Sequence, residues 1–228
     1  MSTKISFRAS EVVGAQQSLD ALTKRYGQTA AEDADIIVAL GGDGFMLQTL
    51  NEVRPLGKPV YGMHRGTVGF LMNAFGEDDL VARLSEAEEA TIIPLHMRAG
   101  SEDGEVTEAL AINEVSLLRA GPQAARLEIS VDGRSRMPEL VCDGALVATP
   151  AGSTAYNYSA HGPILPIGSE VLALTAVAAF RPRRWRGALL PKTATVRFDV
   201  FEPEKRPVMA DADSRPVRSV LWVEVKSA

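Results

Sequence analysis

The spacing of apolar residues changes near Thr91, and this change constrains the fold of the 228-residue chain more than any other feature. Before it, short apolar runs typical of strands buried on both faces alternate with stretches in which apolar residues recur at helical spacing. After it, apolar and polar residues mostly alternate with a period of two, and turn residues separate the stretches. We therefore predict an α/β domain over residues 1–94 and a β-rich domain over residues 95–228.

In the first part, strand-like runs occur at residues 35–40 and 59–63. Helical spacing follows Ser10, a potential cap, and stops at Gly27, and it returns between Phe45 and Val53 and in an acidic stretch over residues 78–90. Strands that alternate with helices predict a parallel sheet. In the second part, strands are expected at residues 127–131, 195–200 and 220–225, and Asp132-Gly133 is a hairpin signal.

Composition narrows the class of protein. Hydrophobic residues make up 46% of the chain and charged residues 23%, which is typical of a globular protein. The net charge of −5 gives no broad electrostatic attraction to nucleic acid or acidic membranes, so we expect neither as a partner. The longest apolar stretch, residues 171–180, is too short to span a bilayer. A single cysteine, Cys142, and an N-terminus that lacks a signal-like apolar stretch predict a reducing, cytoplasmic location.

The first candidate site is Gly41-Gly42-Asp43-Gly44, which follows a buried strand and precedes a helix. Open α/β sheets bind ligands at this position, and glycines let the backbone approach phosphate oxygens near a helix N-terminus. A carboxylate there would repel phosphate, but it could accept the proton of a hydroxyl group or orient that hydroxyl for attack on phosphorus. On these four residues alone, a tight turn in which Asp43 caps the next helix is an equally good interpretation.

The second candidate site is the run from Asp143 to Pro163, which is rich in small and hydroxylated residues and contains Tyr156, Asn157 and Tyr158. Such a run offers backbone amides and hydroxyl groups to a polar or anionic ligand, and a tyrosine face to a base. A turn-rich connection between strands is the alternative. The length of the run and its density of hydrogen-bonding side chains favour a ligand loop.

Two further signals are weaker. The adjacent Asn113 and Glu114 could bind a carboxamide and a ribose diol, although a solvated strand end is the commoner reason for such a pair. Residues 62–71 form a second glycine-rich stretch in which Phe70 could pack on a base, but its spacing differs from Gly-x-Gly-x-x-Gly. A plain strand-to-turn connection is the alternative there.

Several nucleotide and metal motifs do not occur in the sequence. It contains no Gly-x-x-x-x-Gly-Lys-Ser/Thr, which excludes a P-loop enzyme. Three scattered histidines and one cysteine exclude the common structural zinc sites. The basic stretch over residues 181–186 suggests a subunit contact or a structural role more than a nucleic-acid site, because the chain as a whole is acidic.

The order of these motifs resembles the NAD kinase family, particularly its bacterial members, from about residue 35 to residue 191. The Gly-Ser-Thr-Ala-Tyr segment that ends at Tyr156 is highly specific, whereas Gly-Gly-Asp-Gly is shared with related lipid and sugar kinases. The resemblance implies an α/β domain followed by a β-sandwich-like domain, with the site in the cleft between them. It also implies transfer of the γ-phosphate of ATP to the 2′-hydroxyl of the adenosine ribose of NAD.

The resemblance assigns roles to individual residues. Asp43 matches the catalytic aspartate, and Gly41 and Gly42 match the loop that holds the ATP phosphates. The positions that match the NAD site are Gly44, Phe70, Asn113, Glu114, Asp143, Ala151, Thr154, Ala155, Tyr156 and Ser159. In this family the aspartate at the position of Asp143 is supplied across a subunit interface, which implies a homodimer or homotetramer. The chain shows no carboxylate cluster dedicated to a metal, so Mg²⁺ or another divalent cation is expected to arrive with ATP.

Two alternatives remain at this point. A lipid or sugar kinase of the same superfamily would need an apolar cleft or a basic membrane-facing surface, and the sequence shows neither clearly. A non-catalytic dinucleotide sensor would bind NAD without consuming ATP, and the intact Asp43 argues against it.

Overall fold

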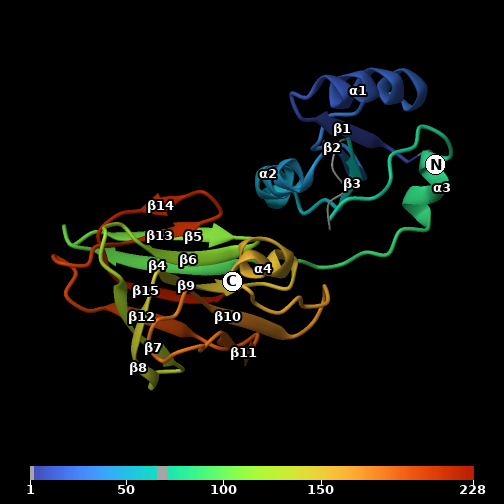
Figure 1. Ribbon diagram of the computed structural model, residues 1–228. Coiled ribbons are helices and arrows are strands. Elements are labelled where there is room, and N and C mark those ends of the chain that lie inside the picture. Colours follow the sequence, from blue (N-terminus) through green and yellow to red (C-terminus); the bar gives the residue numbers. More distant parts are fainter. Residues whose placement is uncertain (1–2, 66–70) are drawn as a thin grey trace. The chain divides into compact units, whose positions relative to one another are not determined.

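The computed structural model describes residues 3–65 and 71–228. Phe70 therefore lies outside the described residues. The chain divides into two compact units, Met1–Glu89 and Ala90–Ala228 (Figure 1).

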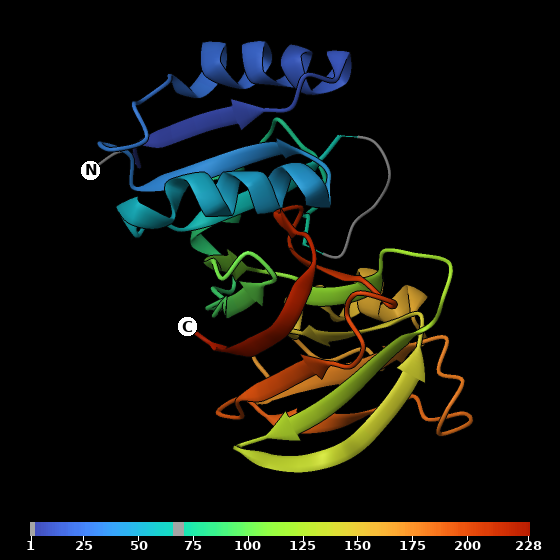
Figure 2. The same ribbon diagram turned by 90° about the vertical axis from the view of Figure 1, so that its left-hand side faces the viewer.

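The first unit is built on a three-stranded parallel sheet in the order β1 (Ile5–Ala9), β2 (Ile36–Gly41) and β3 (Val60–His64) (Figure 2). Its helices are α1 (Val13–Tyr26), α2 (Asp43–Val53), the short 3₁₀ helix η1 (Arg54–Leu56) and α3 (Leu80–Ser85). Alternate strand residues pack with α1 and α3 into one apolar core made of Ile5, Phe7, Ala15, Leu22, Val38, Leu40, Met63 and Leu80. This arrangement confirms the predicted parallel α/β layer.

Two of the predicted helices differ from the structure. The first begins at Val13 with Val12 in the capping position, so Ser10 is not its cap, although Gly27 ends it with φ 81° as expected. The acidic helix expected over 78–90 is confined to Leu80–Ser85. Of these six residues only Leu80 is buried, and residues 86–90 are exposed. A longer helix would therefore gain no further packing against the core.

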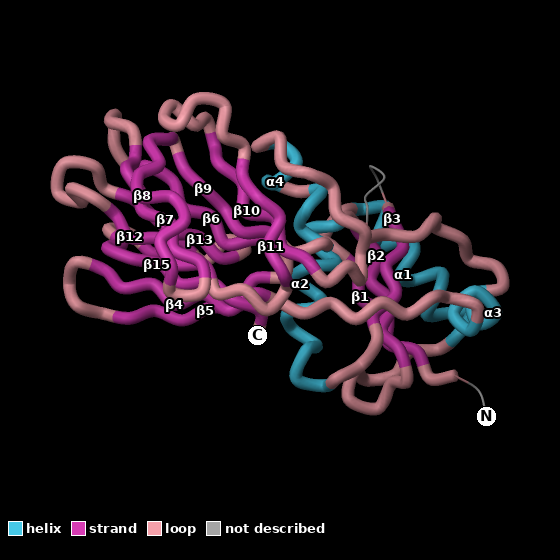
Figure 3. The backbone as a smooth tube through the Cα atoms, turned by 90° about the horizontal axis from the view of Figure 1, so that it is seen from below, coloured by secondary structure: helices cyan, strands magenta, loops and turns pink. Residues whose placement is uncertain are grey.

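The second unit contains two six-stranded antiparallel sheets, which form the long magenta strands of Figure 3. One sheet has the order β5 (Val106–Ala111), β4 (Leu95–Ser101), β15 (Val220–Ser227), β12 (Val196–Val200), β7 (Ala125–Val131) and β8 (Arg134–Cys142). The other has the order β11 (Gly187–Pro191), β10 (Val171–Val177), β9 (Gly144–Ala148), β6 (Glu114–Arg119), β13 (Val208–Ala212) and β14 (Pro216–Val217).

The two sheets share one apolar core, which confirms the β-sandwich. Inward-facing residues of both sheets form it, and Phe198 on β12 is its largest fully buried side chain. The hairpin between β7 and β8 turns at Asp132 and Gly133 with φ of 52° and 72°, the positive values that a tight hairpin turn requires. The helical segments described in this unit, η2 (Ala151–Thr154) and α4 (Tyr156–Ser159), are short and follow β9.

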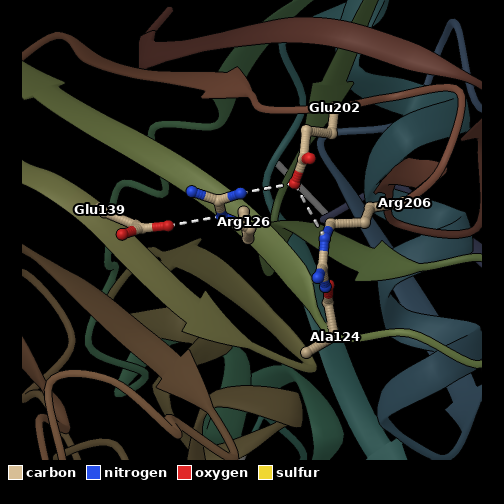
Figure 4. A network of polar contacts seen from close by, with 5 residues as sticks. All are labelled: Ala124, Arg126, Glu139, Glu202 and Arg206. Carbon is tan, nitrogen blue, oxygen red and sulfur yellow. Dashed lines mark hydrogen bonds and ion pairs between the residues drawn. The ribbon is translucent and has the colours of Figure 1, made fainter.

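A surface network ties the edge of the first of these sheets to the turn after β12 (Figure 4). Arg126 on β7 bridges Glu139 on β8 and Glu202, each at 2.5 Å. Arg206 donates to Glu202 at 3.2 Å and to the carbonyl oxygen of Ala124 at 2.6 Å. All these side chains are partly solvent-exposed, so solvent screens each pair and its contribution to stability is small.

Candidate functional site

The Gly-Gly-Asp-Gly motif forms a turn between β2 and α2, which we call the glycine turn (residues 41–44). Gly41 ends the strand, Gly42 occupies the N-cap position, and α2 begins at Asp43, two residues earlier than the sequence predicts. The Asp43 carboxylate therefore lies at the N-terminal end of the helix, where the helix dipole is positive. Its Oδ1 accepts the backbone N–H of Leu71 at 3.2 Å, and the Gly41 carbonyl oxygen accepts the N–H of Arg65 at 2.8 Å.

Two glycines of the glycine turn have empty space where a side chain would lie. A Cβ atom added at Gly42 or Gly44 would meet no described atom within 4 Å. The packing of the described residues therefore does not require glycine at these positions. Glycine leaves room there for a ligand to approach the backbone amides at the start of the helix.

The second unit brings Asn113 and Glu114 beside the run that follows β9. Glu114 at the start of β6 pairs with Ala148 at the end of β9, so the turn before β6 and the 149–165 loop after β9 begin at the same edge of the sheet. Thr149 links the turn and the loop through two hydrogen bonds. Its N–H donates to the carbonyl oxygen of Asn113 at 2.9 Å, and its hydroxyl donates to the carbonyl oxygen of Ile112 at 2.6 Å. Gly152 packs so closely that an added Cβ would collide with the Asn113 carbonyl.

The side chains of Asn113 and Glu114 each present a buried oxygen atom, Oδ1 and Oε2, that has no hydrogen-bond partner among the described residues. Buried polar atoms in native proteins are nearly always paired, so these two are candidates for ligand contact. The pKa of Glu114 is raised to about 7: burial is the largest cause, the charges of Asp213 and Asp211 add to it, and a backbone hydrogen bond from Tyr156 opposes them. A carboxyl group that titrates near neutrality is typical of functional sites.

A buried polar cluster shapes the 149–165 loop, and sequence reasoning missed it. Asn157 donates to the carbonyl oxygens of Ser153 at 3.0 Å and Pro163 at 2.9 Å, and it accepts the hydroxyl of Thr175 on β10 at 2.6 Å. The Ser153 hydroxyl donates to the Pro150 carbonyl oxygen at 2.7 Å. Asn157, Ser153 and Thr175 have no exposed surface. The sequence shows Asn157 within a polar run but carries no signal that pairs it with Thr175.

The remaining predicted residues of the loop lie along η2 and α4. Ala151 is buried, Thr154, Ala155 and Tyr156 are half-buried, and Ser159 is exposed at the end of α4. Tyr156 packs against the apolar cluster that contains Leu146 and Ala148. Burial raises the pKa of Tyr156, and the charges of Glu114 and Asp143 add to this effect, so the ring lies near the Asn113–Glu114 pair.

Asp143 lies at the opposite end of β9 from that pair, although its charge still acts on Tyr156. It precedes β9, whereas Thr149 follows it, and the four residue steps from Gly144 to Ala148 span roughly 13 Å. Arg119 at the end of β6 holds the Asp143 carboxylate at 2.7 Å and donates its backbone N–H to the Asp143 carbonyl oxygen at 2.9 Å. Of the predicted NAD residues, Asp143 is thus the one that the fold places at the far end of the central strand.

The described residues offer little support for other chemistries. Cys142 is buried, and burial raises the pKa of its thiol to about 12, so the neutral form prevails and it is a poor nucleophile. Residues 3–65 and 71–228 contain no group of three or more histidine, cysteine, aspartate or glutamate side chains that could hold a metal ion. Over the same residues, none of the helices has the length and apolar content needed to cross a membrane.

Two family models match the chain. Residues 2–89 match the ATP-NAD kinase N-terminal domain and residues 112–216 match the ATP-NAD kinase C-terminal domain. An NAD kinase of Cereibacter sphaeroides is 70% identical over 224 residues, which cover 98% of this chain and 88% of that protein. The chain belongs to the NAD kinase family. It is therefore an ATP-dependent kinase that acts on NAD. An NAD kinase of Hyphomonas neptunium is 60% identical over the same shares of both chains.

Solved structures of distant NAD kinases share the fold. The structure of yeast NADH kinase in complex with NADH superposes with a TM-score of 0.80 at 19% identity, covering 99% of this chain and 80% of that one. An NAD kinase from Archaeoglobus fulgidus in complex with ATP gives a TM-score of 0.75 at 24% identity, covering 98% and 90%. At this level of identity the likeness shows that the NAD kinase fold is retained. The family models and the NAD kinases of 60% and 70% identity decide against a lipid or sugar kinase.

Proposed function

We propose that the chain transfers the γ-phosphate of ATP to the 2′-hydroxyl of the adenosine ribose of NAD, giving NADP and ADP, with Asp43 as the catalytic residue. The observation that supports this assignment is the glycine turn. It places one carboxylate at the first residue of a helix, beside two glycines whose backbone is open to a ligand. Phosphoryl transfer needs this combination of a backbone cradle for phosphates and a group that acts on the attacking hydroxyl.

In the proposed mechanism the backbone of Gly41 and Gly42 holds the phosphates of ATP, and Gly44 lines the NAD pocket next to them. The Asp43 carboxylate accepts the proton of the 2′-hydroxyl, or orients that hydroxyl, as its oxygen attacks the γ-phosphorus. The bond between the γ-phosphorus and the β–γ bridging oxygen breaks, and ADP leaves. The hydrogen bond from the Leu71 amide to Oδ1 restrains the carboxylate.

We propose that the second domain, residues 95–228, holds NAD, while the first domain, residues 1–94, carries the catalytic turn. The unpartnered oxygens of Asn113 and Glu114 accept the hydroxyls of an NAD ribose. The other proposed contacts in this domain are Ala151, Thr154, Ala155, Tyr156 and Ser159, and in the first domain Phe70, which lies outside the described residues. The buried network around Asn157 keeps the 149–165 loop in one conformation, which reduces the ordering cost of binding.

A divalent cation, Mg²⁺ or an equivalent, fits a site in which ATP itself supplies most of the ligands. The described residues form no carboxylate cluster that would hold such an ion by themselves. Mg²⁺ is commonly bound through substrate phosphates, water and one or two carboxylates, and it would neutralise phosphate charge here. Asp43 is the carboxylate of the glycine turn that would contribute to holding it.

We further propose a homo-oligomer, a dimer or a tetramer, in which Asp143 of one subunit serves the NAD site of another. The position of Asp143 at the far end of β9 from Asn113 supports this. Its ion pair with Arg119 holds the carboxylate in place at the surface.

The test is product formation from NAD, ATP and Mg²⁺, followed with an NADP-specific dehydrogenase. We expect NADP and ADP in equal amounts, and no product from NAD that lacks the adenosine 2′-hydroxyl. Phosphate on any other hydroxyl, or ATP hydrolysis without NADP, would overturn the proposed reaction. Asp35→Asn is a matched control, because this carboxylate accepts the Lys4 amide at the opposite end of β2.

A further inference from the structure

The turn that carries Asn113 and Glu114, which we call the pair turn (residues 112–114), directs three consecutive backbone amides at one carboxylate. Asp213 accepts the N–H of Ile112 at 2.5 Å, that of Asn113 at 3.2 Å with both oxygens, and that of Glu114 at 3.3 Å. These residues lie about a hundred positions away in the sequence. A carboxylate with three amide donors is an anchor for the backbone, since hydrogen bonds to charged groups are worth about twice neutral ones.

The fold presents Asp213 to the pair turn through strand pairing. β13 pairs with β6 so that Ala212 lies opposite Val115, which places the next residue, Asp213, beside the start of β6. Asp213 adopts φ 47°, a left-handed conformation that aspartate tolerates, and Asp211 accepts the N–H of Ser214 at 2.7 Å across the same bend. Asp213 is mostly buried, and burial raises its pKa while the three amides lower it.

We propose that Asp213 is a positioning residue for NAD recognition: it fixes the pair turn so that the unpartnered oxygens of Asn113 and Glu114 face the NAD ribose. This inference rests on the proposed function of that pair. The Oδ1 of Asn113 and the Oε2 of Glu114 have no partner within the described residues, so their direction depends on the backbone of the pair turn and, for Glu114, on the hydrogen bond from the Tyr156 amide. Thr149 holds the carbonyl side of the pair turn, and Asp213 holds its amide side.

Asp213 also changes the charge state of the pair. Glu114 faces the carboxylates of Asp213 and Asp211, both on the β13 side, and the backbone amide and ring of Tyr156 on the loop side. The two carboxylates raise its pKa and the Tyr156 amide lowers it. Removing the charge of Asp213 therefore lowers the pH at which Glu114 ionises.

The experiment compares Asp213→Asn with the wild type in steady-state kinetics across pH. The amide cannot accept three N–H groups as a carboxylate does, so we expect the KM for NAD to rise about tenfold or more, with the KM for ATP nearly unchanged. The acid limb of kcat/KM for NAD should move to lower pH. Asp103→Asn is the control: this carboxylate accepts the Glu105 amide in the turn at the other end of β5, away from the pair turn.

The outcomes separate this inference from the proposed function. If Asn113→Ala and Glu114→Gln raise the KM for NAD but Asp213→Asn does not, Asp213 is not a positioning residue and the inference is overturned. If none of the three changes it, the proposed role of the pair is itself wrong. If Asp213→Asn raises the KM for NAD and the KM for ATP equally, and the acid limb of kcat/KM for NAD stays at the wild-type pH, the inference is also overturned.

A second variant covers the case in which Asp213→Asn does not fold. Asp213→Glu keeps the charge but moves the oxygens outward by one methylene group. We expect a higher KM for NAD and an acid limb at the wild-type pH, because the charge near Glu114 is retained. An unchanged KM for NAD in this variant would contradict the positioning role.

Discussion

The glycine turn of the first unit and the pair turn of the second present ligand-binding groups in opposite ways. The glycine turn is four consecutive residues, open at Gly42 and Gly44, and its key carboxylate lies at a helix N-terminus. The pair turn is closed: its backbone is held by Thr149 on one side and Asp213 on the other, from segments far apart in the sequence. One region needs space for phosphates to approach the backbone, whereas the other needs side chains held in one direction.

This difference separates the physical tasks of the two regions. Catalysis on a phosphoryl group calls for open amides and one well-placed carboxylate, and both can be encoded locally. Recognition of a ribose calls for buried acceptors in a fixed geometry, which only long-range hydrogen bonds provide. Substitutions in the pair turn and its supports should therefore change stability and NAD affinity, and those in the glycine turn should change turnover.

The largest effect on stability is expected for Glu114→Gln, and it depends on pH. Because the pKa of Glu114 is raised to about 7 in the folded protein, the fold binds a proton there more tightly than the unfolded chain does. Stability from this group is thus lost as pH rises from about 4.5 to about 7. Glutamine stays neutral, so the variant should gain on the order of 3 kcal/mol in unfolding free energy at pH 8 relative to pH 5.

Urea unfolding of both proteins at the two pH values measures this gain. Glu202→Gln is the control: the hydrogen bond from Arg126 lowers its pKa, so it stays ionised across this range and should show no such dependence on pH. A Glu114→Gln gain that is the same at both pH values would show that the site is less buried than described.

The next effect is expected for Thr175→Val in the cluster that shapes the 149–165 loop. Valine keeps the shape but leaves the Oδ1 atom of Asn157 buried without its 2.6 Å partner. The unfolding free energy should fall by about 1–3 kcal/mol, and the KM for NAD should rise. Thr107→Val on β5, an exposed position, should change stability by less than about 0.5 kcal/mol. A Thr175→Val protein with wild-type stability and wild-type NAD affinity would show that this cluster does not support the 149–165 loop.

The smallest effect on stability, a gain, is expected for Gly44→Ala in the glycine turn. An alanine Cβ meets no described atom within 4 Å, and alanine is the better helix former, so stability should rise by about 0.5–1 kcal/mol. Turnover should fall, because the methyl group occupies the side on which substrate approaches. Gly14→Ala is a matched control at the second residue of α1, with the same gain and full activity expected. Full activity in Gly44→Ala would contradict the open-backbone interpretation.

The same contrast explains what the sequence could predict. The glycine turn, the parallel layer and the Asp132-Gly133 hairpin depend on neighbouring residues, so their spacing reveals them. The supports of the pair turn could not be found this way. Asp213 accepts backbone N–H groups of residues about a hundred positions earlier, and Thr175 on β10 donates its hydroxyl to Asn157 in α4. Both contacts depend on the topology of the sheets. The acidic stretch after Ser85 failed as a helix for a related reason: it has helical spacing but no core to pack against.

The most direct test of the account is to measure kcat and the NAD dissociation constant of Asp43→Asn side by side with the wild type. Asparagine keeps the shape and an acceptor oxygen but cannot take the hydroxyl proton, so we expect kcat to fall about a thousandfold or more. The dissociation constant for NAD should stay within about twofold, because most of the NAD contacts that we propose lie in the second unit. A variant that keeps most of its turnover, or one that loses affinity for NAD in proportion to rate, would contradict the division of tasks between the two turns.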